Sequence, residues 1–197
     1  MTLLHLVRHG ETAWSRVRRL TSVTDLDLTE AGVTQAASLR GHLDPADFGL
    51  VLCSPRRRAQ RTAQLAGFAP AAVVVDEDLA EWAYGDYEGL TRDQIGERVP
   101  GWEIWTGEVP GGESAEQVRA RVGRVIERVA SSGVERAICF AHAHVLRALT
   151  LVWLDLEFTH GEAFPLDTAT ISILGDSHGR RALLRWNAPP SIHRPPS

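Results

Sequence analysis

Four apolar stretches of the sequence are each followed by a side chain that can bind an anion or carry a proton. They are Leu3–Val7 before Arg8 and His9, Leu50–Cys53 before Arg58, Ala72–Val75 before Glu81, and Ala137–Ala141 before His142. If these stretches are parallel strands of one sheet, their carboxyl ends meet at one edge, where α/β proteins bind ligands. Two histidines, two arginines and a carboxylate would then share one site.

This set of residue types suits phosphoryl transfer. A phosphomonoester carries about two negative charges near neutral pH, and arginine binds phosphate through two parallel hydrogen bonds. Fixed cations around the phosphorus lower the barrier by ~3 kcal/mol or more each and can take the place of a metal ion. A neutral imidazole such as that of His9 can attack phosphorus. Glu81 can protonate the leaving oxygen and then activate water.

Short apolar runs alternate with longer helical patterns along the sequence. This alternation predicts strands and helices in turn, and therefore an α/β fold: a three-layer α/β/α sandwich around a mostly parallel sheet. Thr29 and Ser114 are candidate helix caps, and Pro55 is expected in the first turn of a helix that ends near Gly67.

At the C-terminal end of the pattern, the runs Thr170–Leu174 and Ala182–Trp186 are joined by a tight polar loop, which predicts an antiparallel strand at the sheet edge. Residues 82–112 break the rhythm and predict a small inserted cap. We therefore expect one domain over residues 1–188 and a loosely ordered, proline-rich tail over residues 189–197.

Composition limits the partners. The chain has 197 residues, a formal charge of −4 and a pI near 6.1, which argues against nucleic acid or a membrane surface. All 21 basic residues are arginine, so lysine chemistry is excluded. Codon bias is the favoured explanation of this composition, ahead of a functional need for arginine. Cys53 and Cys139 sit in apolar runs, and no apolar segment approaches the ~20 residues of a membrane span. These features indicate a cytoplasmic protein.

Five motifs occur in the right order over nearly the whole chain: "LVRHGETAW", "CSPRRRAQRTA", "LAEWAYGDYEGLT", "PGGES" and "FAHAHVLRAL". Together they resemble the histidine phosphatase superfamily, the phosphoglycerate mutase-like proteins. The resemblance implies that His9 is a phosphohistidine nucleophile, with Arg8 and Arg58 as phosphate ligands, His142 as the second histidine and Glu81 as acid and base. It implies neither cofactor nor metal.

Substrate contacts are implied for a further set of positions, namely Ser15, Thr21, Ser22, Tyr84 and Ala143. Two of them depart from the family pattern, because Ser22 and Ala143 stand where glycine is usual. The added side chains could narrow the pocket or shift a backbone amide. His144 is expected to line the pocket, and Glu11 to pair with neighbouring basic groups.

The cap separates two activities within the family. Mutases carry a basic pair after a tryptophan, whereas this chain has Thr106 and Gly107 in "WEIWTGEVPGGES". A pocket without those cations favours transfer of the phosphoryl group to water. We therefore expect a metal-independent phosphatase acting on a small phosphate ester, sugar phosphates first, and a homodimer is compatible with the sequence. Within the family, the chain resembles sedoheptulose-bisphosphatase-type enzymes and actinobacterial acid phosphatases. The alternatives are a mutase and a catalytically silent phospho-ligand binding module.

Overall fold

A six-stranded sheet with strand order β3-β2-β4-β1-β5-β6 forms the centre of the computed structural model, which describes residues 2–190. The strands are β1 (Leu3–Arg8), β2 (Leu50–Cys53), β3 (Val74–Val75), β4 (Arg136–Ala141), β5 (Ile171–Ser177) and β6 (Arg180–Ala188). The four strands from β3 to β1 are parallel. β5 runs antiparallel to both of its neighbours, β1 and β6. The α/β class and the antiparallel edge are thus confirmed.

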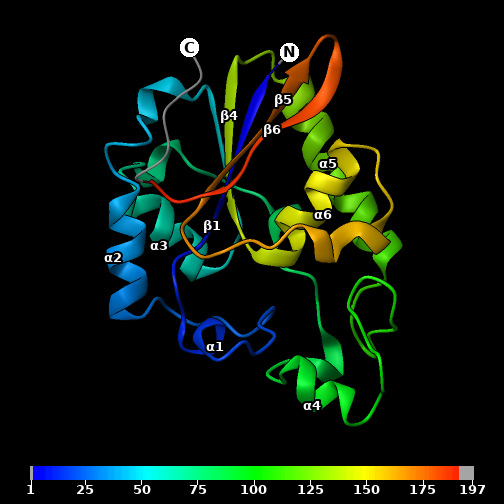
Figure 1. Ribbon diagram of the computed structural model, residues 1–197. Helices are drawn as coiled ribbons and strands as arrows, with labels where there is room; N and C mark the ends of the chain where they lie inside the picture. Colours follow the sequence, from blue (N-terminus) through cyan, green and yellow to red (C-terminus); the bar gives the residue numbers. More distant parts are fainter. Residues whose placement is uncertain (1, 191–197) are drawn as a thin grey trace.

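Helices cover both faces of this sheet (Figure 1). The α-helices are α1 (Ala13–Arg16), α2 (Glu30–Ser38), α3 (Arg57–Leu65), α4 (Arg92–Gly96), α5 (Ala115–Ser131) and α6 (Ala143–Trp153). The 3₁₀ helices are η1 (Pro45–Asp47), η2 (Pro70–Ala72), η3 (Glu77–Leu79), η4 (Gly85–Tyr87) and η5 (Phe158–Ala163). Figure 1 shows α2 and α3 on one side of the sheet and α5 and α6 on the other, with α1 and α4 beyond one end.

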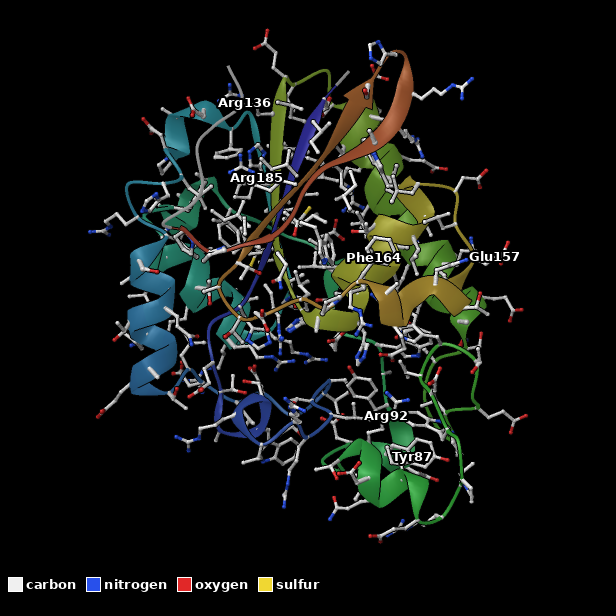
Figure 2. The ribbon with its side chains drawn as sticks, in the orientation of Figure 1. Tyr87, Arg92, Arg136, Glu157, Phe164 and Arg185 are labelled. Atoms are coloured by element: carbon white, nitrogen blue, oxygen red, sulfur yellow. The ribbon has the colours of Figure 1, made fainter. Side chains whose placement is uncertain are left out.

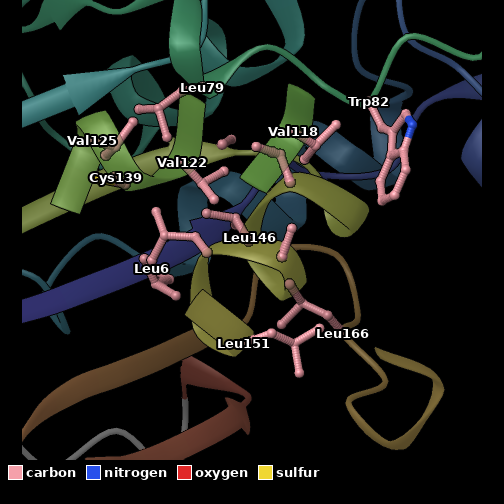
Figure 3. Packing of buried hydrophobic residues seen from close by; sticks show 14 of the residues in the cluster. Leu6, Leu79, Trp82, Val118, Val122, Val125, Cys139, Leu146, Leu151 and Leu166 are labelled. Carbon is pink, nitrogen blue, oxygen red and sulfur yellow. The ribbon is translucent and has the colours of Figure 1, made fainter. Parts of the chain in front are cut away.

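Alternating residues of the central strands explain why both faces are covered. Leu4 and Leu6 of β1 belong to the larger apolar cluster, whereas Val7 belongs to the smaller one. Figure 3 shows part of the larger cluster, where Leu6 and Cys139 from the sheet lie among Val118, Val122 and Val125 of α5 and Leu146 and Leu151 of α6. The central strands β1 and β4 are apolar on both sides because each side packs against helices.

Local signals set most helix boundaries, and two element boundaries differ from the predictions. Thr29 caps α2 by accepting from the amide of Gly32, as expected, and α2 ends at Ser38. α3 begins at Arg57, so Pro55 precedes it and is not in its first turn. The run Ala72–Val75 contributes two strand residues, because Pro70–Ala72 forms η2 instead.

Residues 82–112 leave the sheet layers and contain η4 and α4, which lie below the sheet in Figure 1. Within this segment, the rings of Tyr87 and Trp102 make an edge-to-face contact, with ring centroids 5.1 Å apart. Both rings join the larger apolar cluster. Among residues 2–190, no helix is long and apolar enough to cross a membrane. The part of the expected tail at residues 191–197 lies outside the described residues.

Candidate active site

Strand β1 delivers Arg8 and His9 to the edge of the sheet. The amide of His9 donates to the carbonyl of Ala141 at 3.0 Å, which fixes the residue beside the end of β4. Gly10 follows because the chain passes very close to α2: a Cβ on Gly10 would lie 2.4 Å from the carbonyl oxygen of Gly32. A side chain at either glycine would push this turn away from α2.

The imidazole of His9 is buried and has one nitrogen engaged. Nδ1 lies 2.7 Å from the carbonyl oxygen of Gly10, and since a carbonyl only accepts, Nδ1 carries the proton. Burial, then the charges of Arg58 and Arg8, hold the pKa of His9 well below 6.5. The ring is therefore neutral at neutral pH, and Nε2 has a free lone pair. This is the state that a nucleophile needs.

The side chain of Glu81 lies beside the first turn of α6 and accepts hydrogen bonds from the backbone of that helix. Its carboxylate accepts from the amides of Val145 at 2.8 Å and His144 at 3.1 Å, and from its neighbour Trp82 at 3.0 Å. His142, the N-cap residue, provides no side-chain cap of its own. A carboxylate here satisfies donors that have no partner within the helix and complements the helix dipole. Glu81 thus caps α6 from a distant segment while it faces the cleft.

Arg58 and His142 lie behind His9 and do not line the cleft. Arg58 is completely buried, and its Nε donates to Nδ1 of His142 at 3.1 Å. The terminal nitrogens of Arg58 donate to the carbonyls of Thr24 at 3.0 Å and Thr21 at 3.1 Å. Since Nδ1 of His142 accepts, Nε2 carries the proton and donates to the hydroxyl of Ser54 at 2.7 Å. The rings of His9 and His142 are 5.1 Å apart.

The predicted substrate contacts divide into two groups. Ser15, Thr21, Tyr84 and Ala143 line the cleft with Arg8, His9 and Glu81. Ser22 does not, because its side chain is buried and its hydroxyl donates to Glu88 at 2.5 Å. Glu11 lines the cleft but bonds the hydroxyl of Thr29 at 2.8 Å, instead of a basic group.

The cleft has a volume of about 630 Å³ and holds arginines that sequence reasoning missed. Its charged lining consists of Arg8, Arg16, Arg18, Arg19, Arg92 and Arg147, with the carboxylates Glu11, Glu81, Glu162 and Asp167. In Figure 2, Arg92 lies near Tyr87 on the segment that carries α4. Arg147 could have been found as a lone charge in the apolar stretch "VLRALTLVW", whereas Arg92 has no local signal.

Two of these arginines are held by backbone oxygens. Arg8 donates from Nη1 to the carbonyl of Leu166 at 2.5 Å, and its Nε is buried without a hydrogen-bond partner among residues 2–190. Arg147 donates to the carbonyl of Gly161 and lies 4.7 Å from the ring centroid of Trp105. Arg56, the N-cap residue of α3, is half-buried. No group of three or more His, Cys, Asp or Glu residues in the described part of the chain could hold a metal ion.

The chain is similar to several known proteins. The sequence pattern of the histidine phosphatase superfamily (branch 1) matches residues 4–189. An acid phosphatase of Mycobacterium tuberculosis is 44% identical over 91% of this chain and 89% of its own length. The sedoheptulose 1,7-bisphosphatase of Saccharomyces cerevisiae is 34% identical over 77% of this chain and 67% of its own. A solved structure of a Mycobacterium tuberculosis open reading frame has a TM-score of 0.90 and 39% identity, over 96% of this chain and 98% of the other.

Proposed function

The chain belongs to the histidine phosphatase superfamily, and we propose that it hydrolyses a small phosphate monoester through a phosphohistidine formed on His9. One observation carries the proposal. His9 is a neutral imidazole, proton on Nδ1 and lone pair on Nε2, in a cleft that also contains Arg8 and Glu81.

In the first step, Nε2 of His9 attacks phosphorus, and the bond from phosphorus to the ester oxygen breaks. The protonated carboxyl of Glu81 gives its proton to that oxygen, so the alcohol leaves neutral. The ring gains positive charge, which the hydrogen bond from Nδ1 to Gly10 stabilises. The buried Nε of Arg8, which lacks a protein partner among the described residues, is available to a phosphoryl oxygen.

In the second step, the Glu81 carboxylate takes a proton from water, and the water oxygen attacks phosphorus. The bond from Nε2 to phosphorus breaks, inorganic phosphate leaves, and His9 returns to its neutral form. Arg58 and His142 act from behind: Arg58 fixes the His142 ring and the loop at 21–24, and its charge helps to keep His9 unprotonated. No step requires a metal ion, because arginines supply the positive charge.

Hydrolysis is favoured over transfer to a second hydroxyl by the composition of the cap. Thr106 and Gly107 replace the basic pair typical of mutases. Arg92, a cap arginine that lines the cleft, bonds Glu103 at 2.7 Å and lies 3.8 Å from Glu162, so its charge is already balanced.

A mutase is the second candidate, since the cleft also has three exposed arginines, Arg16, Arg18 and Arg19. They could retain a doubly charged intermediate until the phosphoryl group returns to a second hydroxyl. Product analysis separates the two activities: free phosphate equal to substrate consumed supports the phosphatase, and a rearranged ester supports the mutase. Ligand binding without turnover would support the silent binding module.

The decisive experiment compares His9→Ala with His42→Ala, which removes an exposed histidine outside the cleft. Phosphate release from a sugar phosphate is measured with a chelator present. We expect His9→Ala to lose activity by about 10³-fold or more and the control to keep it. Acid-labile, base-stable phosphate bound to the native protein would identify the intermediate. Full activity of His9→Ala would refute the mechanism.

Two further expectations complete the proposal, a cytoplasmic location and a homodimer. Both cysteines of the chain are free and buried, which suits the reducing cytoplasm. Sedimentation at several protein concentrations tests for the homodimer.

A further inference from the structure

His144 is a polar residue of the cleft that the mechanism above does not use. Its ring is half-buried, and Nδ1 lies 2.6 Å from the hydroxyl oxygen of Tyr84. The rings of Trp105 and Tyr84 pack edge-to-face against the His144 ring, with centroid distances of 5.5 Å and 5.7 Å. Nε2 of His144 neither donates nor accepts a hydrogen bond with any residue in the range 2–190, and the residue lines the cleft. The ring is therefore rigidly held, with one nitrogen free for a ligand.

The position of His144 relates it to the leaving group. Its own amide donates to the Glu81 carboxylate at 3.1 Å. Glu81 delivers a proton to the ester oxygen in the proposed mechanism, so the His144 ring lies next to the alcohol part of the substrate. Whatever Nε2 binds must belong to the carbon skeleton near the ester bond, and not to the phosphoryl group at His9.

The protonation of His144 is tied to that of Glu81 through Tyr84. Burial raises the pKa of Tyr84, and the charge of Glu81 and a side-chain hydrogen bond with Glu81 raise it further. The hydroxyl therefore keeps its single proton and can donate it either to Glu81 or to His144. With Glu81 ionised, the hydroxyl proton turns toward the carboxylate, and Nδ1 of His144 must donate to the oxygen. Nε2 is then an acceptor. With Glu81 protonated, Tyr84 can donate to Nδ1, and Nε2 becomes a donor.

Glu81 alternates between these two states in every catalytic cycle. A ligand group opposite Nε2 must therefore donate in one state and accept in the other. A hydroxyl does both, whereas a carbonyl or phosphoryl oxygen only accepts and an ammonium only donates. Burial lowers the pKa of His144 to about 3, so the ring stays neutral and can switch tautomer at any working pH.

We propose that His144 selects phosphate esters with a hydroxyl on the carbon next to the ester-bearing carbon, by hydrogen-bonding that hydroxyl through Nε2. Tyr84 acts as a positioning residue that couples the tautomer of His144 to Glu81. This inference rests on the proposed phosphatase activity and narrows its substrate class to esters of polyols and sugars.

The test uses two esters that differ by a single hydroxyl, 1,2-propanediol 1-phosphate and propyl phosphate. For the wild-type protein we expect kcat/KM to be about tenfold higher for the diol ester, the worth of one neutral hydrogen bond. His144→Phe keeps an aromatic ring between Trp105 and Tyr84 but has no nitrogen, and should bring the ratio to about one. Tyr84→Phe frees the tautomer and should lower the ratio, and His144→Gln should restore part of it.

Each outcome decides one question. A wild-type ratio near one overturns the inference even if no variant folds, and so does a wild-type ratio that persists in His144→Phe. Failure of the wild-type protein to release phosphate from both esters and from a sugar phosphate would instead overturn the proposed function. Release from the sugar phosphate alone would overturn the inference, because an adjacent hydroxyl would then not be enough for selection. Circular dichroism checks the fold of each variant, so a purely structural loss, which would slow both esters equally, is distinguished from a loss of selection.

Discussion

Replacing Glu81 by glutamine separates the two roles that the structure gives this residue. The carboxylate caps α6 through the amides of His144 and Val145, and it faces the cleft beside His9. Glutamine keeps one oxygen that can accept from an amide, but it turns an NH₂ group toward the other backbone donor. The negative charge at the helix N-terminus disappears as well.

The expected cost in stability follows from these contacts. Loss of a helix cap is worth about 1 kcal/mol, and loss of a partly buried charge at a helix terminus adds up to about 1 kcal/mol. In a domain of this size, 1 to 2 kcal/mol corresponds to a melting temperature lower by about 2–8 °C. Ser114→Ala is the matched control, since Ser114 caps α5 by accepting from the amide of Gln117 and lies outside the cleft.

The expected kinetic effect depends on the leaving group. An alkyl alcohol must be protonated as it leaves, so Glu81→Gln should slow its release by about 10² to 10⁴-fold. p-Nitrophenol leaves as a stable anion and needs no acid in the first step. It still requires Glu81 for water activation in the second step, so the phosphohistidine should accumulate.

Rapid mixing distinguishes these steps. With p-nitrophenyl phosphate, Glu81→Gln should give a burst of one nitrophenolate per active site and then turn over slowly, whereas the alkyl ester should show no burst. Ser114→Ala should lose similar stability and keep its rates. Equal slowing of the first turnover for both esters would show that Glu81 acts as a helix cap alone, and the acid–base assignment would fall.

Two further predictions concern stability. The pKa values of His9, His142 and His144 are all lowered from 6.5, burial being the largest cause. Below about pH 6.5 the unfolded chain therefore binds protons that the folded chain does not, and each histidine removes about 1.4 kcal/mol of stability per pH unit. Urea unfolding at several pH values should show this fall, less steep in His144→Phe; a pH-independent stability between pH 5 and 7 would contradict it. Ser22→Ala removes the hydroxyl that donates to Glu88 at 2.5 Å and accepts from the amide of Tyr84 at 3.2 Å, and should destabilise the protein by about 1–3 kcal/mol. Thr34→Ala on the exposed face of α2 is its control, and equal unfolding curves for the two variants would refute this account.

Local sequence signals predicted the elements and their order well. The caps at Thr29 and Ser114 act within three residues of the amides they bind, so their effect can be read from the sequence. The strand ends were found because buried strands are continuous apolar runs. The position of a polar residue after such a run then places it at one edge of the sheet.

Contacts between distant segments could not be predicted in the same way. The partner of Ser22 is Glu88, and the partner of Glu81 is the backbone of α6. No periodicity connects residues more than sixty positions apart, so the sequence predicts a catalytic role for Glu81 without indicating the helix whose amides it binds. The expected basic partner of Glu11 is also wrong: Glu11 accepts a hydrogen bond from Thr29, 18 positions along the chain.

The position of β1 in the sheet has a consequence for how the protein is made. β1 pairs with β4 on one side, Leu3 opposite Arg136, and with β5 on the other, Val7 opposite Ile171. During synthesis, the strand that precedes His9 emerges before β4 and β5, so neither of its neighbours exists until more than a hundred further residues have been made. The catalytic edge is therefore among the last parts to assemble, and a nascent chain that stops before β5 cannot hold His9 between two strands.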